Sequence, residues 1–355
     1  HDVAARAIES CRRRRRPTFS HLRPVRLLGH AGSDVEKSDR TREQIEAGEA
    51  RDPLIATARL GSDGGLLPRE EFSAWYEEIR SRVAAASREA VRRPKLATAA
   101  EVIAPVAPSH PDLVDAEARR DDYHAARVTI FGATNALPEN ADKPRHLAVQ
   151  INRALSDGLA KYPQMVIFGE DVSRKGGVYH VTDGLMRRAG VGRVFNTLLD
   201  ETTILGLAIG AGHLGLLPVP EIQYLAYLHN AEDQLRGEAC SLQFFSDAQF
   251  RNPMVVRIAS FGYQRGFGGH FHNDNSISVL RDIPGLIIAA PSRGDDAAMM
   301  MRSCLAAAVV DGAVVAFLEP IALYMTKDLE PGDGEWLSFY PPPAVAAPIG
   351  RGRVH

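Results

Sequence analysis

The feature of this sequence that most constrains its fold is a regular alternation of short apolar runs and longer helical patterns from His146 onward. Short apolar runs bounded by turn residues are typical of buried strands. Strands that alternate with helices and end in polar or glycine-rich turns predict an α/β fold, a doubly wound parallel sheet flanked by helices. The expected strands cover 165–168, 218–223, 254–258, 286–289 and 314–318, and the expected helices 146–162, 202–214, 231–244 and 295–308.

The residues before this region follow a different pattern. Residues 70–90 place apolar side chains at steps of three and four, which predicts an amphipathic helix. Residues 104–112 contain three prolines and predict a linker. We therefore expect a mostly helical segment over 1–103, a linker over 104–144, the sheet domain over 145–330, and a lead over 331–355 into a further carboxyl-terminal domain.

Composition narrows the possible functions. With 24% charged residues and a formal net charge of -2, nothing indicates binding to nucleic acid or to a membrane surface. The basic run 12–16 is more typical of a solvated helix end than of a nucleic-acid patch. No apolar run approaches the roughly 20 residues of a membrane span. Cys11, Cys240 and Cys304 have no metal or redox spacing, which favours free thiols in a cytoplasmic protein.

Most candidate functional residues fall in four polar or glycine-rich turns. In parallel sheets, ligands bind at the carboxyl ends of strands, so these turns are where a site is expected. The turns are GED with GGVY over 169–179, FNTLLDE over 195–201, PEIQY with DQ over 220–234, and GFGGHFH over 266–272.

Each candidate residue also has a simpler interpretation when it is taken alone. Glu201 at a helix start is explained by the helix dipole. Tyr227 on an apolar helix face is explained by core packing. His270 and His272 fit a surface loop, and as a metal pair they lack a third ligand at a convincing spacing.

The order and spacing of the motifs support a sharper interpretation. GEDV with GGVY, FNTLLDE with ILGLAIG, PVPEIQY with DQL, and GGHFH with IPGL and APS follow one another over 146–330. This part of the chain resembles the beta subunit of the decarboxylating component of branched-chain and pyruvate 2-oxoacid dehydrogenase complexes. The resemblance implies a transketolase-like pyrimidine-binding domain.

Residues 1–103 resemble the carboxyl end of the alpha subunit of the same enzymes. The stretch RLLGHAGSD over 26–34 is similar to an alpha-subunit loop, with Ala31 where many relatives have serine. An alpha-type segment before a beta-type segment implies a fused polypeptide joined through the proline-rich linker. Because the chain begins at His1 with no Met or signal pattern, we expect it to be a piece of a longer protein.

The resemblance implies a thiamine-diphosphate-dependent enzyme that decarboxylates a 2-oxoacid and reductively acylates a lipoyl group. A branched-chain 2-oxoacid is favoured over pyruvate, the lipoyl acyltransferase core is the expected partner, and a homo-oligomer is expected. Glu201 matches the carboxylate beside the pyrimidine ring, Tyr227 the stacking residue, Leu199 and Gln223 lesser contacts, and His272 the acyl-transfer histidine.

On the alpha side, Arg26 and His30 match residues near the diphosphate, with His30 a further catalytic candidate. The family holds Mg²⁺ through a GDG segment followed by asparagine. Residues 332–334 are the only GDG in this chain, and no asparagine follows them. We interpret them as a loop, so no metal ligand is expected here and the Mg²⁺ ligands are expected upstream of His1.

Two alternatives stay open at this stage. A transketolase or deoxyxylulose-phosphate synthase relative would share the pyrimidine-binding fold and the glutamate, although the GHAGSD segment argues against it. A non-catalytic piece that keeps only the fold and an interface is the other. Without the diphosphate-binding half, the chain is expected to be inactive alone.

Overall fold

The computed structural model describes residues 2–263 and 268–353 and divides into two compact units, His1–Lys95 and Leu96–His355. The second unit is built on one six-stranded sheet in which every strand pair is parallel. The strand order is β2-β1-β3-β4-β6-β5. The strands are β1 (Met165–Gly169), β2 (Val194–Asn196), β3 (Leu217–Ile222), β4 (Met254–Ser260), β5 (Leu286–Ala289) and β6 (Val314–Pro320).

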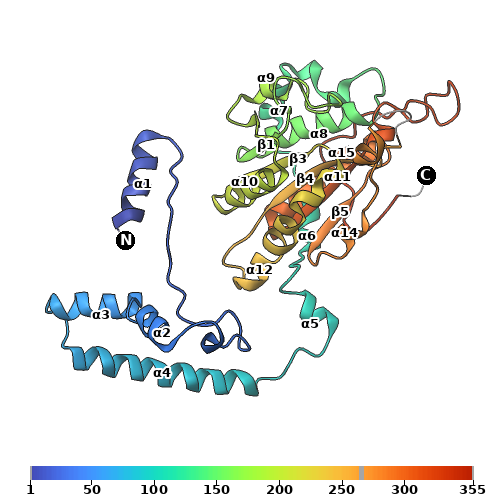
Figure 1. Ribbon diagram of the computed structural model, residues 1–355. Helices are drawn as coiled ribbons and strands as arrows, with labels where there is room; N and C mark the ends of the chain where they lie inside the picture. Colours follow the sequence, from blue (N-terminus) through green and yellow to red (C-terminus); the bar gives the residue numbers. More distant parts are fainter. Residues whose placement is uncertain (1, 264–267, 354–355) are drawn as a thin grey trace. The chain divides into compact units, whose positions relative to one another are not determined.

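Helices cover both faces of this sheet (Figure 1). On one face α8 (Leu147–Lys161) and α15 (Gly294–Asp311) pack into one apolar core. On the other, α10 (Glu201–His213) and α11 (Leu225–Leu228) enclose a second core. Every residue of β1, β3, β4 and β6 is buried, which explains why these strands appear as continuous apolar runs. The doubly wound parallel sheet predicted from the sequence is confirmed.

Two stretches of the second unit differ from the sequence-based elements. Strand β2 was not expected, because three residues are too short to give a strand pattern. The helix expected over 231–244 is interrupted by a π-helical turn (Gln234–Ala239). At Gly237 a Cβ atom would lie 2.8 Å from Asp233 Oδ1. The absence of a side chain at Gly237 therefore leaves room for the Asp233 carboxylate. The shorter helices of this unit are α9 (Leu185–Ala189), α12 (Leu242–Phe245), α13 (Gly269–His272) and α14 (Ser278–Arg281).

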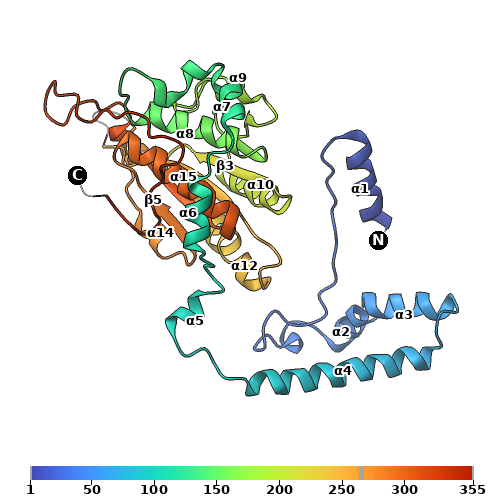
Figure 2. The same cartoon turned by 180° about the vertical axis from the view of Figure 1, so that it is seen from behind.

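The expected linker over 104–144 contains helices α6 (Pro111–Arg119) and α7 (His124–Phe131), preceded by α5 (Ala99–Ile103). Pro111 occupies the first turn of α6, where its missing N–H costs nothing. Val114 and Ala118 pack against α15, and Figure 2 shows α6 beside α15 from behind. These residues belong to the compact second unit.

The first unit is helical, as the sequence predicts. Its helices are α1 (Asp2–Arg14), α2 (Arg42–Glu49), α3 (Pro53–Asp63) and α4 (Arg69–Arg92). The basic run begins in the exposed last turn of α1, which fits a solvated helix end. Of the described residues in this unit, only Gly61 is buried, beneath the ring of Phe72. Trp75, Ile79 and Val83 on α4 are exposed.

No helix in the described ranges combines the length and apolar character needed to cross a bilayer.

Candidate functional site

Polar side chains gather where β1, β3, β4 and β6 end. The chain runs from β1 outward to β2 and returns past β1 to β3, so the strand order reverses here. Such a reversal opens a crevice beyond the carboxyl ends of the strands. Backbones approach closely at this edge, because a Cβ on Gly169 would lie 2.7 Å from the carbonyl oxygen of Glu221.

Glu201 begins α10, just beyond the end of β2, and is 9% exposed. The side chain of Asp200 caps this helix by accepting a hydrogen bond from the Thr203 amide at 3.1 Å. Glu170, which follows β1, lies within electrostatic range of Glu201. Burial raises the pKa of Glu170, and the negative charges of Asp171 and Glu201 raise it further. The predicted carboxylate is therefore buried in an acidic part of the edge.

His272 lies in α13 and is half-buried, and its contacts indicate which ring nitrogen carries the proton. Its Nδ1 is 2.9 Å from the carbonyl oxygen of Gly268. A carbonyl oxygen only accepts hydrogen bonds, so Nδ1 carries the proton and Nε2 is left as the basic nitrogen. Nε2 lies 3.5 Å from the hydroxyl oxygen of Tyr227, at the outer limit of a hydrogen bond. The structure thus brings two predicted site residues together.

Aromatic rings surround this histidine. The Tyr224 ring lies 4.5 Å from the His272 ring, nearly perpendicular at 82°. The Tyr227 ring is 6.0 Å away at 78°. Tyr224 immediately precedes α11 and is 3% exposed, whereas Tyr227 is half-buried.

A buried ion network lies beneath the edge. Arg257 of β4 donates to Glu221 Oε2 of β3 at 2.5 Å and to Glu319 Oε1 of β6 at 2.6 Å. Tyr324 completes the network by donating to Glu319 Oε2 at 2.6 Å. Burial raises the pKa of Glu221, and Arg257 offsets part of that effect. Removing one member would leave a buried charge unpaired.

Sequence reasoning missed this network, although a signal for it was present. Glu221, Arg257 and Glu319 are the single charged residues in three otherwise uncharged strands. Charged residues are almost never fully buried unless they are paired. Three such strands in one sheet therefore predict mutual pairing.

The other predicted residues lie in different places. Gln223 follows β3 and lines a small cavity with Tyr179, Arg257 and Tyr324. Leu199, in the loop before α10, is 66% exposed.

Arg26 and His30 belong to the first unit, where both approach Asp34. The His30 amide donates to Asp34 Oδ2 at 2.6 Å, and Arg26 Nη2 is 3.9 Å from the same oxygen. Gly266 and Phe267 of the fourth turn lie outside the described residues.

The GDG segment over 332–334 is an exposed loop whose aspartate is already engaged. Asp333 accepts hydrogen bonds from the backbone amides of Leu329, Glu330 and Glu335 at 2.7–3.0 Å. The hydrogen bond from the Glu335 amide, together with those from the Glu330 and Leu329 amides, lowers the pKa of Asp333. Within the described ranges, no group of three or more His, Cys, Asp or Glu side chains is placed to hold a metal ion.

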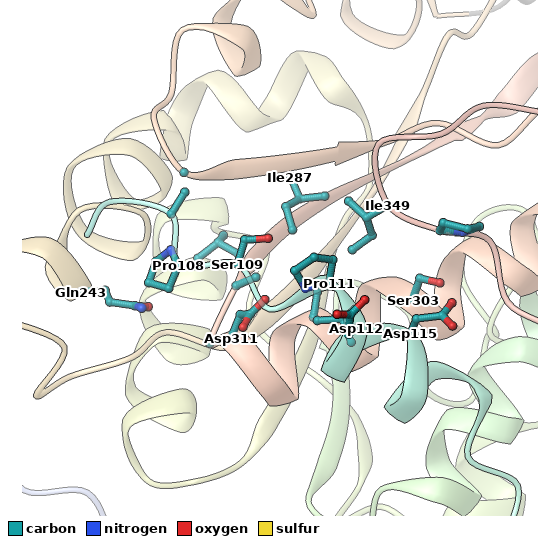
Figure 3. A pocket seen from close by; sticks show the side chains of 18 of the residues that line it. Pro108, Ser109, Pro111, Asp112, Asp115, Gln243, Ile287, Ser303, Asp311 and Ile349 are labelled. Carbon is teal, nitrogen blue, oxygen red and sulfur yellow. The ribbon is translucent and has the colours of Figure 1, made fainter. Parts of the chain in front are cut away.

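A cavity of about 700 Å³ lies at the opposite edge of the sheet, near the start of β6 (Figure 3). Its lining includes Pro108, Asp112, Asp311 and Ile349, and none of the predicted site residues. Because ligands of parallel sheets bind at the carboxyl edge, where the acidic and aromatic groups converge, we place the candidate site there.

Comparison with known proteins identifies the family to which the sheet domain belongs. The family model of the transketolase pyrimidine-binding domain matches residues 146–326, which is about half of the chain. The chain belongs to this family. The family model of the dehydrogenase E1 component matches residues 1–99. An E1-type segment and a pyrimidine-binding domain therefore occur in one chain in the order predicted from the motifs.

This chain is similar to beta subunits of 2-oxoacid dehydrogenases. It is 35% identical over 196 residues to the 2-oxoisovalerate dehydrogenase subunit beta of Pseudomonas aeruginosa, covering 55% of this chain and 54% of that protein. It is 37% identical over 213 residues to the 3-methyl-2-oxobutanoate dehydrogenase subunit beta of Mycobacterium tuberculosis, covering 60% and 56%. It is 34% identical over 205 residues to the pyruvate dehydrogenase E1 component subunit beta of Acholeplasma laidlawii, covering 58% of each. The chain thus spans somewhat more than half of each relative.

Proposed function

We propose that this chain supplies the pyrimidine-binding side of a thiamine-diphosphate-dependent 2-oxoacid dehydrogenase, with a branched-chain 2-oxoacid as the favoured substrate and pyruvate next. The observation that carries the proposal is the buried carboxylate of Glu201 at the carboxyl edge of the sheet, the edge to which Tyr227 and His272 also belong. The similarity to beta subunits named for both substrates supports it.

The residues at this edge fit a pyrimidine ring better than a diphosphate. A neutral aromatic ring needs an apolar or aromatic face and a few placed polar groups. Here Glu170 and Glu201 are negative and would repel phosphate, whereas Asp171 is paired with Lys175. Arg257 is already paired with two carboxylates. In our proposal Arg26 and His30 approach the diphosphate instead, because both carry hydrogen-bond donors suited to phosphate oxygens.

Each residue then has a physical role. When bound, thiamine diphosphate supplies the nucleophilic carbon that attacks 2-oxo groups. Glu201 holds a hydrogen bond at a pyrimidine nitrogen, and Tyr227 offers its ring as a packing face. Gln223 and Leu199 flank the ring.

His272 acts at a different point of the reaction. Its Nε2, the nitrogen left basic by the Gly268 contact, exchanges a proton with the lipoyl acceptor. The partner in this proposal is a lipoyl acyltransferase core in the cytoplasm, bound by a homo-oligomer.

The test is Glu201→Gln in the intact protein that carries this sequence, assayed for decarboxylation. A neutral amide can form a hydrogen bond to a ring nitrogen but cannot exchange a proton with it as a carboxyl group does, so we expect a loss of at least about 100-fold in kcat, the scale of a lost acid–base group. The matched control is Glu238→Gln, which makes the same change at an exposed position. Activity of Glu201→Gln equal to that of the control would remove the proposal.

A further inference from the structure

We propose that Tyr224 and Tyr179 are positioning residues that hold the His272 ring in its working orientation. The inference rests on the proposed function, because it gives His272 the acyl-transfer role. It adds two residues and a hydrogen bond between them that the motif comparison does not assign.

The segment that carries His272 holds its imidazole through the hydrogen bond to the Gly268 carbonyl oxygen, and side chains of other segments can add to that support. Helix α13 has four residues, too few to be stable on its own. Its first residue is Gly269, and Gly268 precedes it. The imidazole is half-buried, and the Tyr224 ring packs against it.

Tyr224 is placed to give that support. It directly follows β3 and Gln223, and its ring meets the imidazole at 4.5 Å in a nearly perpendicular arrangement. Perpendicular aromatic contacts are favourable and directional. At 3% exposed, Tyr224 forms a fixed wall against a residue from a less buried segment.

The wall is anchored through its hydroxyl group. Tyr179 donates a hydrogen bond to the Tyr224 hydroxyl oxygen at 3.2 Å. The Tyr179 ring in turn lies 5.2 Å from the ring of Tyr324, which donates to Glu319 of the buried ion network. A chain of direct contacts therefore runs from the strand core to His272. Burial, and then the hydrogen bond with Tyr179, raise the pKa of Tyr224.

Two kinds of substitution distinguish the effect of the Tyr224 ring from the effect of the hydrogen bond between Tyr179 and Tyr224. Tyr224→Leu removes the ring contact, whereas Tyr224→Phe and Tyr179→Phe keep the rings and remove the hydrogen bond. The control is Tyr340→Phe, which removes a buried tyrosine hydroxyl that donates to Asp157, in a network separate from His272. All variants are made in the intact protein.

The activity readout compares two half-reactions: acyl transfer to a lipoyl acceptor and decarboxylation with an artificial electron acceptor. We expect Tyr224→Phe and Tyr179→Phe each to slow acyl transfer about five-fold, the scale of one net hydrogen bond, with decarboxylation unchanged. The double variant should lose no more than either single variant, because all three lack the same bond. Tyr224→Leu should lose more.

The structural readout is the imidazole signal of His272 in protein with isotope-labelled histidine, assigned by its loss in His272→Gln. We expect the signal to shift or broaden in Tyr224→Leu and to stay in place in Tyr340→Phe. An unmoved signal in Tyr224→Leu, or equal loss in both half-reactions, overturns the inference. If His272→Gln leaves acyl transfer intact, the proposed role of His272 fails. The His272 signal in Tyr224→Leu, which keeps the histidine, still reports whether Tyr224 orients the imidazole.

Discussion

At the scale of single residues, the geometry of His272 depends on a neighbour without a side chain. Gly268 has φ +75°, and a Cβ there would lie 2.4 Å from His272 Cβ and 2.5 Å from Nδ1. Such distances require the ring to move. The adjacent Gly269 also has positive φ, +54°, but a Cβ there would meet nothing within 4 Å. The two glycines of the GGHFH motif therefore serve different purposes.

We predict that Gly268→Ala lowers acyl transfer to a lipoyl acceptor about ten-fold or more, because it displaces the ring and the hydrogen bond that fixes its tautomer. Gly269→Ala is the matched control: it carries the cost of an unfavourable backbone angle without the clash. The measurement is the rate of acyl transfer relative to decarboxylation for both variants. Equal effects of the two substitutions would show that backbone strain, and not the contact with His272, matters.

At the scale of elements, one buried network attaches α7 to the sheet domain. Arg127 of α7 donates to Asp157 of α8 at 2.7 Å and to Glu139 at 2.6 Å. Asp157 also accepts from Tyr340 of the carboxyl-terminal segment. Burial alone would raise the pKa of Glu139, but hydrogen bonds from Arg127 outweigh it and hold that pKa below its usual range. Polar contacts thus join segments far apart in sequence.

Because the pKa of Glu139 is lowered in this network, the stability of the fold depends on pH. A carboxyl whose pKa is lowered in the folded state contributes stability above its unfolded pKa, and that contribution is lost as pH falls through the folded pKa. We predict that Glu139→Gln costs about 2 kcal/mol in free energy of unfolding near neutral pH and much less in strong acid. Urea unfolding across pH measures this difference. Asp282→Asn, in an exposed ion pair, should change stability by less than about 1 kcal/mol. A cost for Glu139→Gln that does not shrink with acid would contradict the assignment.

At the scale of the whole molecule, the two units differ in their capacity to fold. The second unit contains the apolar cores on both faces of the sheet. Among the described residues of the first unit, no apolar side chain is buried, and α4 exposes Trp75, Ile79 and Val83. Helices without a tertiary core are marginal in water.

We therefore predict that amides in residues 2–95 exchange with deuterium far faster than those of β1, β3, β4 and β6 in the 355-residue chain. Hydrogen exchange followed by mass spectrometry gives this comparison by segment. The control segment is α8, a buried helix of the second unit, which should be protected. Protection of α4 equal to that of α8 would show that another surface covers the apolar face of α4.

The sequence by itself determined most of the strands of the sheet and where the candidate site residues lie along the chain. Fully buried parallel strands leave continuous apolar runs, so β1, β3, β4 and β6 are visible in the linear pattern, and the apolar run of β5 is visible although that strand is only partly buried. The order and spacing of the motifs indicated Glu201, Tyr227 and His272 through the resemblance that they carry. Strand β2 and the π-helical turn were not visible, since one is too short and the other depends on the contact between Gly237 and Asp233.

Only the tertiary structure decided which side chains meet. Arg257, Glu221 and Glu319 are far apart in sequence and pair because their strands are neighbours. Tyr224 meets His272 because the segment after β3 packs against α13, and Gly268 fixes the tautomer through its carbonyl oxygen. A periodic pattern reports burial, which is a property of one segment. Orientation at a site arises between segments, so it depends on the register and packing that folding creates.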